Sequence, residues 1–256
     1  MKRKIIFVCA IVLLALVSCG GRAVRIARYI QVHSNNFVGE YIKIQNLRLV
    51  RCDSVLIVEL GDARDTYVNI FSKGEDKQLF DSLAAKHHDT TYDGELFAWM
   101  MDWLGRPIST DSSEYNRIGT ASTTSDIDSI IVTCAKSWDV THPEGSSLND
   151  ITHFRGWSPY PFILSGYDQS KGYVRFIDKR LSEMVEDDFI MALSTVRNNN
   201  NNIAYSIYDN SNIVFDLKFE SLPAMDGIYP LQINMFMDDG TVFELNYDWV
   251  VSSAED

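Results

Sequence analysis

The side chains best suited to metal binding or general-base chemistry are five histidines, and the densest group is His87, His88 and Asp89. Adjacent histidines on a helix point about 100° apart, so they do not converge as a zinc-binding pair one turn apart would. A polar helix end explains the group without a metal, because a cationic histidine is favourable at a helix C-terminus. We therefore expect a helix end here and no metal site.

A second group invites a serine–histidine–aspartate triad, because His142 and His153 flank Asp150 and the serines at 146 and 147. No Gly-x-Ser-x-Gly motif supports a triad, and close neighbours in sequence rarely form one. The chain also lacks a glycine-rich phosphate loop, a dinucleotide fingerprint and the spacing of a calcium loop. We expect no catalytic residue, no cofactor and no metal ion, and hence a protein that is not an enzyme.

The aromatic residues Trp138, Trp157 and Tyr160 fall in a loop-rich part of the chain and are candidate ligand-binding residues. Exposed aromatic faces bind sugar rings or partner proteins. The competing interpretation is that these rings fill the core, which is the commoner fate of large aromatic side chains.

Composition narrows the class of protein further. The chain has 256 residues, of which 46% are hydrophobic, and a formal net charge of −12. It is too apolar to be disordered, and it is long enough to bury a core. It lacks the basic stripe that binding to nucleic acid requires, so no nucleic-acid partner is expected.

The N-terminus has the pattern of a leader. Residues 1–4 are basic and residues 5–17 form an unbroken apolar run. As a helix this run would span roughly 20 Å, short of the ~30 Å hydrocarbon core of a bilayer. The pattern predicts a signal peptide at residues 1–18, with a short signal anchor as the alternative.

The Leu-Val-Ser-Cys sequence at 16–19 resembles the lipobox of bacterial lipoproteins. The resemblance implies cleavage before Cys19, whose thiol then carries diacylglycerol and whose new amine is usually acylated. Several acyl chains, at about 0.8 kcal/mol per buried CH₂, anchor a protein firmly in a bilayer. Gly20 does not resemble an inner-membrane retention signal, and no acidic run that resembles a surface-export signal follows. We expect the periplasmic face of the outer membrane, with the cell surface as the alternative.

Two cysteines, Cys52 and Cys134, would remain in the mature body beyond Cys19. The periplasm is oxidising, so these two thiols are a candidate disulfide. Two buried free thiols are the alternative. Neither cysteine has a second cysteine or histidine at metal-ligand spacing.

Hydrophobic periodicity predicts strands at residues 41–49, 54–60, 66–71, 126–134, 160–164, 203–208, 213–219, 229–237 and 242–251. Helical spacing predicts helices at 76–86, 95–104 and 179–187. The second helix would place Trp99 and Trp103 on one face. The Asp-Asp-Gly sequence at 238–240 indicates a hairpin, and residues 105–125 read as a long polar loop.

The pattern indicates a mainly β, α+β fold. We expect an immunoglobulin-like β-sandwich at residues 126–251. A β-rich segment with two helices and a polar loop would precede it at 41–125 and pack with it as one unit. Residues 19–40 would form a lipid-anchored tether or a first strand.

Several stretches resemble a known family. They are Ser-Ile-Ile-Val-Thr at 129–133, Trp-Asp at 138–139, His-Pro-Glu-Gly-Ser-Ser-Leu-Asn-Asp-Ile at 142–151, Pro223 with Gly-Ile-Tyr-Pro-Leu at 227–231, and Asp-Asp-Gly at 238–240. Together with the lipobox they resemble an uncharacterised lipoprotein family of Bacteroidetes. The resemblance implies an anchored β-rich fold and assigns no activity and no catalytic residue.

These features favour a lipid-anchored outer-membrane protein with a non-catalytic role in binding or envelope assembly. Its expected partners are the bilayer, through acyl chains on Cys19, and a protein or glycan ligand. One alternative is a periplasmic hydrolase or glycan-processing protein, which needs two carboxylates that converge in a cleft. The other is a surface glycan-binding module, which needs Trp138 or Trp157 on an exposed patch.

Overall fold

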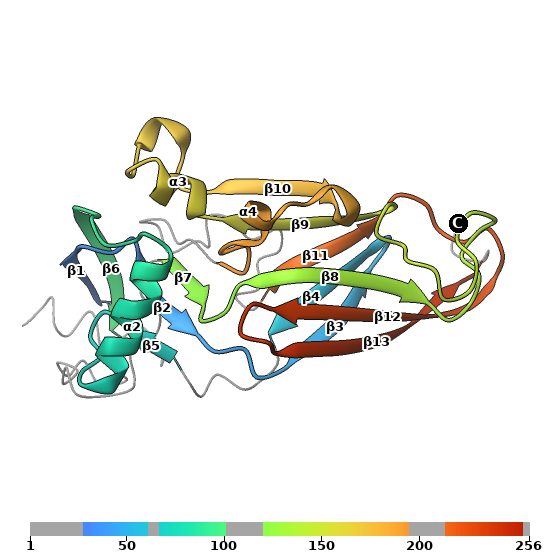
Figure 1. The fold of residues 1–256 in the computed structure, drawn as a ribbon, viewed down its shortest axis with the longest axis horizontal. Coiled ribbons are helices and arrows are strands. Elements are labelled where there is room, and N and C mark those ends of the chain that lie inside the picture. Colours follow the sequence, from blue (N-terminus) through green and yellow to red (C-terminus); the bar gives the residue numbers. More distant parts are fainter. Residues whose placement is uncertain (1–27, 61–66, 101–119, 195–212, 253–256) are drawn as a thin grey trace, which may run out of the picture.

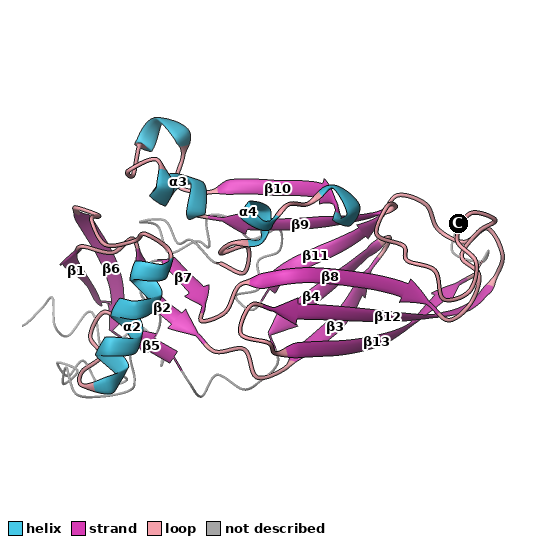
Figure 2. Cartoon of the chain, viewed as in Figure 1, coloured by secondary structure: helices cyan, strands magenta, loops and turns pink. Residues whose placement is uncertain are grey.

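The computed structural model describes residues 28–60, 67–100, 120–194 and 213–252, and the leader with Cys19 lies outside them. The molecule is elongated, with strand β1 near one end and a group of long loops at the other (Figure 1). Strands dominate, and helices α2 and α3 lie toward the β1 end (Figure 2). The mainly β, α+β fold class is confirmed.

The larger sheet has five antiparallel strands in the order β10-β9-β11-β4-β3. Their bounds are β3 Leu47–Cys52, β4 Val55–Leu60, β9 Thr152–Ser158, β10 Arg175–Arg180 and β11 Ile213–Phe219. The runs predicted at 54–60 and 213–219 are thus confirmed as β4 and β11. The run from Thr152 to Ser158 was not predicted, although its side chains alternate between buried and half-buried.

The smaller sheet has three antiparallel strands in the order β13-β12-β8. Their bounds are β8 Ile127–Cys134, β12 Gly227–Met237 and β13 Val242–Val251. All three strands were predicted, and so was the hairpin that joins β12 to β13. Gly240 has φ +84°, a left-handed conformation that favours glycine, and its N–H donates to the Met237 carbonyl.

The two sheets face each other across one apolar core. Leu56 on β4, Phe154 on β9 and Leu217 on β11 pack in the same cluster as Ile233 on β12 and Trp249 on β13. Each strand contributes alternate residues to this core, as the period of two requires. The result is a β-sandwich, and its immunoglobulin-like classification stays a prediction.

The β1 end holds two small sheets. Strand β1 (Arg28–Ser34) pairs with β6 (Gly94–Met100), and β2 (Val38–Ile42) lies between β5 (Tyr67–Asn69) and β7 (Thr120–Thr123). The β2–β7 pair is parallel. Helix α2 (Glu75–Lys86) contacts β2 and β5 and confirms the helix predicted at 76–86. Its acidic first turn and its terminal Lys86 complement the helix dipole.

A second core fills this end of the molecule. Phe37, Tyr41 and Phe80 pack with Phe162 and Met191, which come from the stretch after β9. Phe162 belongs to helix α3 (Tyr160–Leu164). The chain therefore crosses between the two cores more than once. A division at residue 126 does not separate two domains, because β3 and β4 belong to the sandwich.

Three predicted elements are wrong. Residues 94–100 form strand β6 and not a helix, because the nearly all-apolar run pairs its backbone with β1. Residues 160–164 form helix α3 and not a strand, since Pro161 in the first turn has no helical N–H to lose. The helix predicted at 179–187 is instead the end of β10, the 3₁₀ turn η2 (Leu181–Glu183) and the start of α4 (Glu186–Phe189).

Two further boundaries differ from the prediction. The strand predicted at 41–49 is the end of β2 and the start of β3, which lie in different sheets. The loop predicted at 105–125 contains strand β7. The strand predicted at 203–208 and the position of Trp103 lie outside the described residues. A second 3₁₀ turn, η1 (Gln169–Lys171), lies between α3 and β10.

Candidate functional site

Two of the three aromatic residues singled out from the sequence are core residues. Trp138 is 2% exposed, its ring lies 5.1 Å from that of Phe219, and its Nε1–H donates to the Ser221 carbonyl at 3.1 Å. Tyr160 is buried in the second core. Neither ring is available to a ligand, so for both residues the alternative interpretation, that the ring fills the core, is the correct one.

The third aromatic residue, Trp157, is half-buried on the outer face of the five-stranded sheet. Its ring lies 4.6 Å from that of the exposed Phe176, its partner on β10. The structure therefore does not bring Trp138, Trp157 and Tyr160 together. Trp157 alone keeps a surface position.

The candidate disulfide between Cys52 and Cys134 is absent, because both thiols are free. Cys134 on β8 points into the core between the sheets, and burial raises the pKa of its thiol. Cys52 is exposed at the end of β3. The two residues therefore lie in opposite sheets with their side chains in different environments. The predicted lipidation site, Cys19, lies outside the described residues.

The His87 group is a structural network and confirms the predicted helix end. His87 follows α2 and is buried, with Nε2 2.9 Å from Asp126 Oδ2 and Nδ1 3.4 Å from the Tyr41 hydroxyl. Lys86 Nζ also lies 2.8 Å from Asp126, and the Met191 N–H donates to Asp126. Burial would raise the pKa of Asp126, but His87 and Lys86 lower it to about 2. This network joins α2 to the start of β8.

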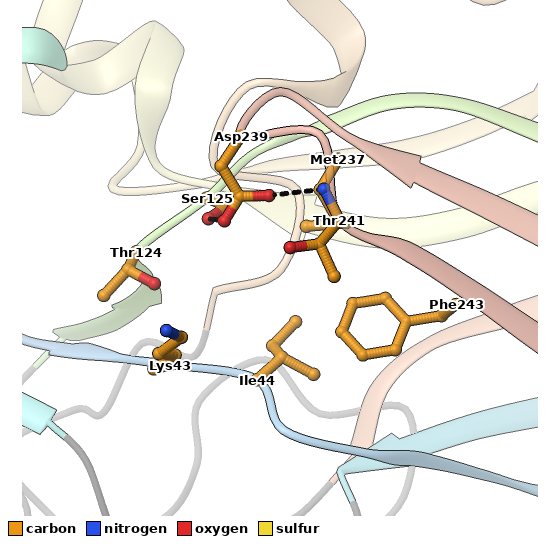
Figure 3. A pocket seen from close by; sticks show the side chains of 8 residues that line it. All are labelled: Lys43, Ile44, Thr124, Ser125, Met237, Asp239, Thr241 and Phe243. Atoms are coloured by element: carbon orange, nitrogen blue, oxygen red, sulfur yellow. Dashed lines mark hydrogen bonds between the residues drawn. The ribbon is translucent and has the colours of Figure 1, made fainter.

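A small cavity lies beside this network, between the chain leading into β3 and the β12–β13 turn (Figure 3). Its volume is about 20 Å³. Asp239 closes one side, where it accepts hydrogen bonds from Ser125 Oγ at 2.6 Å and from the Thr241 N–H at 2.9 Å. A cavity of this size holds about one water molecule, so it is not a ligand site.

His142 and His153, the residues closest to a triad, are each held between two carboxylates. His142 lies 2.9 Å from Asp139 and 3.1 Å from Asp150, one through each ring nitrogen. His153 lies 2.6 Å from Asp178 and 2.7 Å from Glu220 in the same way. Both nitrogens of a histidine can donate only in the imidazolium form, so these are ion pairs rather than general bases.

Ser146 does not complete a triad, because its Oγ donates to the Pro143 carbonyl. Among the described residues, no three histidine, cysteine, aspartate or glutamate side chains are placed to hold a metal ion. His87, His142 and His153 are thus engaged in structural contacts.

The most perturbed carboxylate on the outer face of the sheet is that of Asp216 on β11. It is fully buried 3.4 Å from Arg155 Nε, and neither of its oxygens accepts a hydrogen bond from a described residue. Burial raises its pKa to about 6, with repulsion from Asp178 adding to the effect. A carboxylate sealed from solvent does not meet a substrate, so this pair does not form the cleft that a hydrolase needs.

A candidate binding surface is a groove on the open side of the sandwich, which we call the β8 groove. The sheets approach each other where β3 contacts β13, whereas on the opposite side the η2–α4 segment crosses between β10 and β8 (Figure 1). There a groove of about 310 Å³ remains. It is lined by Asp128, Ser129, Ile130, Ile131, Asn149, Leu181, Met184, Val185, Glu186 and Phe189.

Six of the ten residues that line the β8 groove are apolar, and two of these six are exposed. Ile131 is 40% exposed and Val185 is 59% exposed, against the few per cent typical of the core residues below them. A volume of about 300 Å³ is the lower limit for ligand pockets. Such a groove can take apolar side chains or a small apolar ligand, and it is the candidate functional site.

No signal in the sequence pointed to this groove. Ile131 belongs to a correctly predicted strand, but an exposed outward residue of a strand is ordinary. Val185 and Glu186 fell in the helix that was predicted wrongly at 179–187. Only the crossing of η2 and α4 over the open side brings them opposite β8.

Comparison with known proteins adds no identification: no protein-family model, no curated protein and no solved structure matches the chain. Within the described ranges, no helix is both long and apolar enough to span a bilayer.

Proposed function

We propose that this protein is a lipid-anchored outer-membrane protein that binds its partner without catalysis, through the β8 groove. The groove is the single observation that carries the binding role. The anchor rests on the resemblance of residues 16–19 to a lipobox. The resemblance to a Bacteroidetes lipoprotein family supports the same location.

The lining of the groove supports binding rather than chemistry. Its ionisable side chains are Asp128 and Glu186, and both are exposed. A catalytic acid or base usually has a partner that orients it, and neither carboxylate has one among the described residues. Ser129 and Asn149 add neutral polar groups, and the remaining six lining residues supply apolar contact from both sides, which suits recognition of a partly apolar group.

Photo-crosslinking in intact cells tests the binding role. A photo-crosslinking amino acid in place of Val185 should yield a discrete adduct that disappears when Ile131→Asp is added. The same amino acid in place of Val250, which is 49% exposed on β13 away from the groove, is the matched control. Equal adducts at both positions, or none at 185, would contradict binding through the groove.

Metabolic labelling with a radioactive fatty acid tests the anchor. The full chain should incorporate the label and fractionate with the outer membrane, and Cys19→Ala should lose both properties. Protease shaving of intact cells then distinguishes the periplasmic face, where the body is protected until lysis, from the cell surface. If the wild-type chain incorporated no labelled fatty acid, the lipoprotein assignment would be wrong.

Glycan binding is a second candidate, favoured by the Trp157–Phe176 pair on the outer face of the larger sheet. The next pair on the same face of these strands is Arg155 and Asp178, so aromatic and charged side chains lie side by side. Sugars bind to such combinations of aromatic faces and charged hydrogen-bonding groups. Phe176→Ala should weaken retention on a polysaccharide column, whereas Val250→Ala should not.

A further inference from the structure

We propose that the β8 groove binds an amphipathic helix of a partner protein, which carries apolar side chains on one face and lysine or arginine beside them. This inference rests on the proposed function, because it names the kind of partner that the same groove takes. Three features of the groove carry it: a strand edge that is already paired, an apolar lining and an acidic rim.

The edge of β8 at the groove is already hydrogen-bonded. The side chain of Asn149 accepts from the Val132 N–H at 2.9 Å and donates to the Ile130 carbonyl at 2.7 Å. The Leu148 N–H donates to the Val132 carbonyl at 2.8 Å. An extended segment that entered here would displace these bonds or leave its own N–H and C=O groups unpaired, which is unfavourable when they are buried.

A helix does not meet this difficulty, because its interior N–H and C=O groups bond to each other within the segment. It needs only side-chain contacts from the surface on which it docks. An amphipathic helix that lays its apolar face into an apolar groove binds through residues spaced at i, i+3, i+4 and i+7. A groove whose strand edge is occupied by Asn149 therefore favours a helical partner over an extended one.

The apolar lining offers buried and exposed surface to such a helix. Ile130, Leu181 and Phe189 line the groove and are at most 6% exposed, whereas Ile131 is 40% exposed and Val185 is 59% exposed. Ile131 lies on β8 and Val185 immediately precedes α4, so apolar surface comes from two segments. Covering the exposed parts of these two side chains would remove apolar area from water, which favours docking.

The acidic rim selects a basic partner. Asp128 and Glu186 line the groove and are exposed, and neither forms an ion pair with a described residue. The cations on β10 beside α4, Arg175 and Lys179, already pair with Asp188 at 2.9 and 2.7 Å. Lysine or arginine side chains that flank the apolar face of a helix complement this rim. A neutral apolar small molecule would gain nothing from the two carboxylates.

The probe is a peptide of about 14 residues, with leucines at i, i+3, i+4 and i+7, lysines beside them and a lactam bridge that holds it helical. Its binding to the immobilised full chain is measured in the same detergent for every variant. Val185→Asn should weaken binding by about tenfold, and Glu186→Lys by a smaller factor that vanishes at about 0.5 M salt. Val250→Asn and Glu244→Lys, at exposed positions on β13, are matched controls and should leave binding unchanged.

Three altered peptides test the helix and its charge. One has a central proline and no bridge, which breaks the helix. The second keeps the composition but spreads the leucines around the helix, and the third replaces the lysines with glutamates. Each should bind at least about tenfold more weakly than the parent peptide.

Equal binding of the parent and proline peptides, with Val185→Asn still disruptive, would overturn the helical partner but leave the β8 groove as a binding site. Equal binding of the glutamate peptide would overturn the basic one. Binding that is unchanged by both Val185→Asn and Glu186→Lys would overturn this inference at the groove. A crosslink from position 185 in cells without binding of any peptide would also reject the helix, while the proposed function would stand.

Discussion

The two cores of this protein are closed in different ways. The core of the sandwich is bounded by two regular sheets, and the large side chains that fill it are apolar or aromatic. The smaller core at the β1 end is bordered by buried polar groups, including His87, Asp89 and Asp126. The first core therefore depends on packing volume, and the second depends on buried hydrogen bonds whose strength varies with pH.

Trp249→Ala is the strongest test of the packing side of this contrast. Trp249 is fully buried, with its ring 5.2 Å from that of Phe219 and the Arg51 guanidinium 4.3 Å from its centroid. Deleting a buried tryptophan should lower the free energy of unfolding by about 3–5 kcal/mol. Urea denaturation measures it, with Val250→Ala as the exposed neighbouring control. A loss below about 1 kcal/mol would mean that the core can collapse around the cavity.

Asp89→Ala is the corresponding test at the β1 end. The buried carboxylate accepts from the Phe37 N–H at 2.7 Å, the Val38 N–H at 2.8 Å and the Tyr167 hydroxyl at 2.9 Å. Leaving these donors buried and unpaired should cost about 3 kcal/mol. Asp89→Asn, which keeps one acceptor oxygen, should cost less.

The matched control for Asp89 is Asp81→Ala on the exposed face of α2, which should be nearly neutral. Hydrogen exchange at the amides of Phe37 and Val38 reports the same contact directly. Unchanged protection of both amides in Asp89→Ala would contradict the assigned role.

Acid should destabilise the molecule through Asp126. Its folded pKa of about 2 lies below the ordinary value of about 4 for an aspartate. A carboxylate with a depressed pKa stabilises the fold above the unfolded pKa, and this contribution is lost as pH falls from about 4 to about 2. Asp126→Asn should reduce, by about 1–3 kcal/mol, the free energy of unfolding that is lost between pH 4 and pH 2. Parallel curves for the two proteins below pH 4 would contradict the prediction.

The smallest expected effect is an alkaline one at His142. Burial lowers the pKa of His142, but Asp139 and Asp150 outweigh burial and raise it above the ordinary value. Its stabilisation is therefore complete below the unfolded pKa of about 6.5 and is lost as pH rises through the folded pKa. His142→Gln should remove about 0.5–1 kcal/mol at pH 6 and little at pH 9. The control is His33→Gln, at an exposed histidine. A loss of stability in His142→Gln that does not vary with pH would contradict the prediction that His142 is an imidazolium in the folded protein.

Much of the sandwich could be predicted because the order of apolar and polar residues along its strands follows which side chains are buried. Strands β8, β12 and β13 alternate buried and outward residues, and the Gly240 turn follows from its left-handed conformation. The failures are segments without such a signal. The run at 94–100 is apolar on nearly every side, which suits a helix or a strand, and its pairing with β1 decides. Helix α3 has five residues, too few to show a period.

The candidate site was less predictable than the fold. Aromatic residue type pointed to Trp138 and Tyr160, but residue type does not reveal whether a ring faces the core or the surface, and both are buried. Ile131 and Val185 are unremarkable in sequence. They become neighbours only because the η2–α4 segment crosses from β10 to β8.

The sequence by itself determined which segments can form strands, where the hairpin turns, and that the chain buries a core, because these depend on neighbouring residues and on total apolar content. The tertiary structure alone decided that β3 and β4 join the sandwich, that Cys52 and Cys134 lie apart, and that a groove remains beside β8. Those outcomes depend on contacts between residues distant in the chain, whose free energies no local pattern encodes.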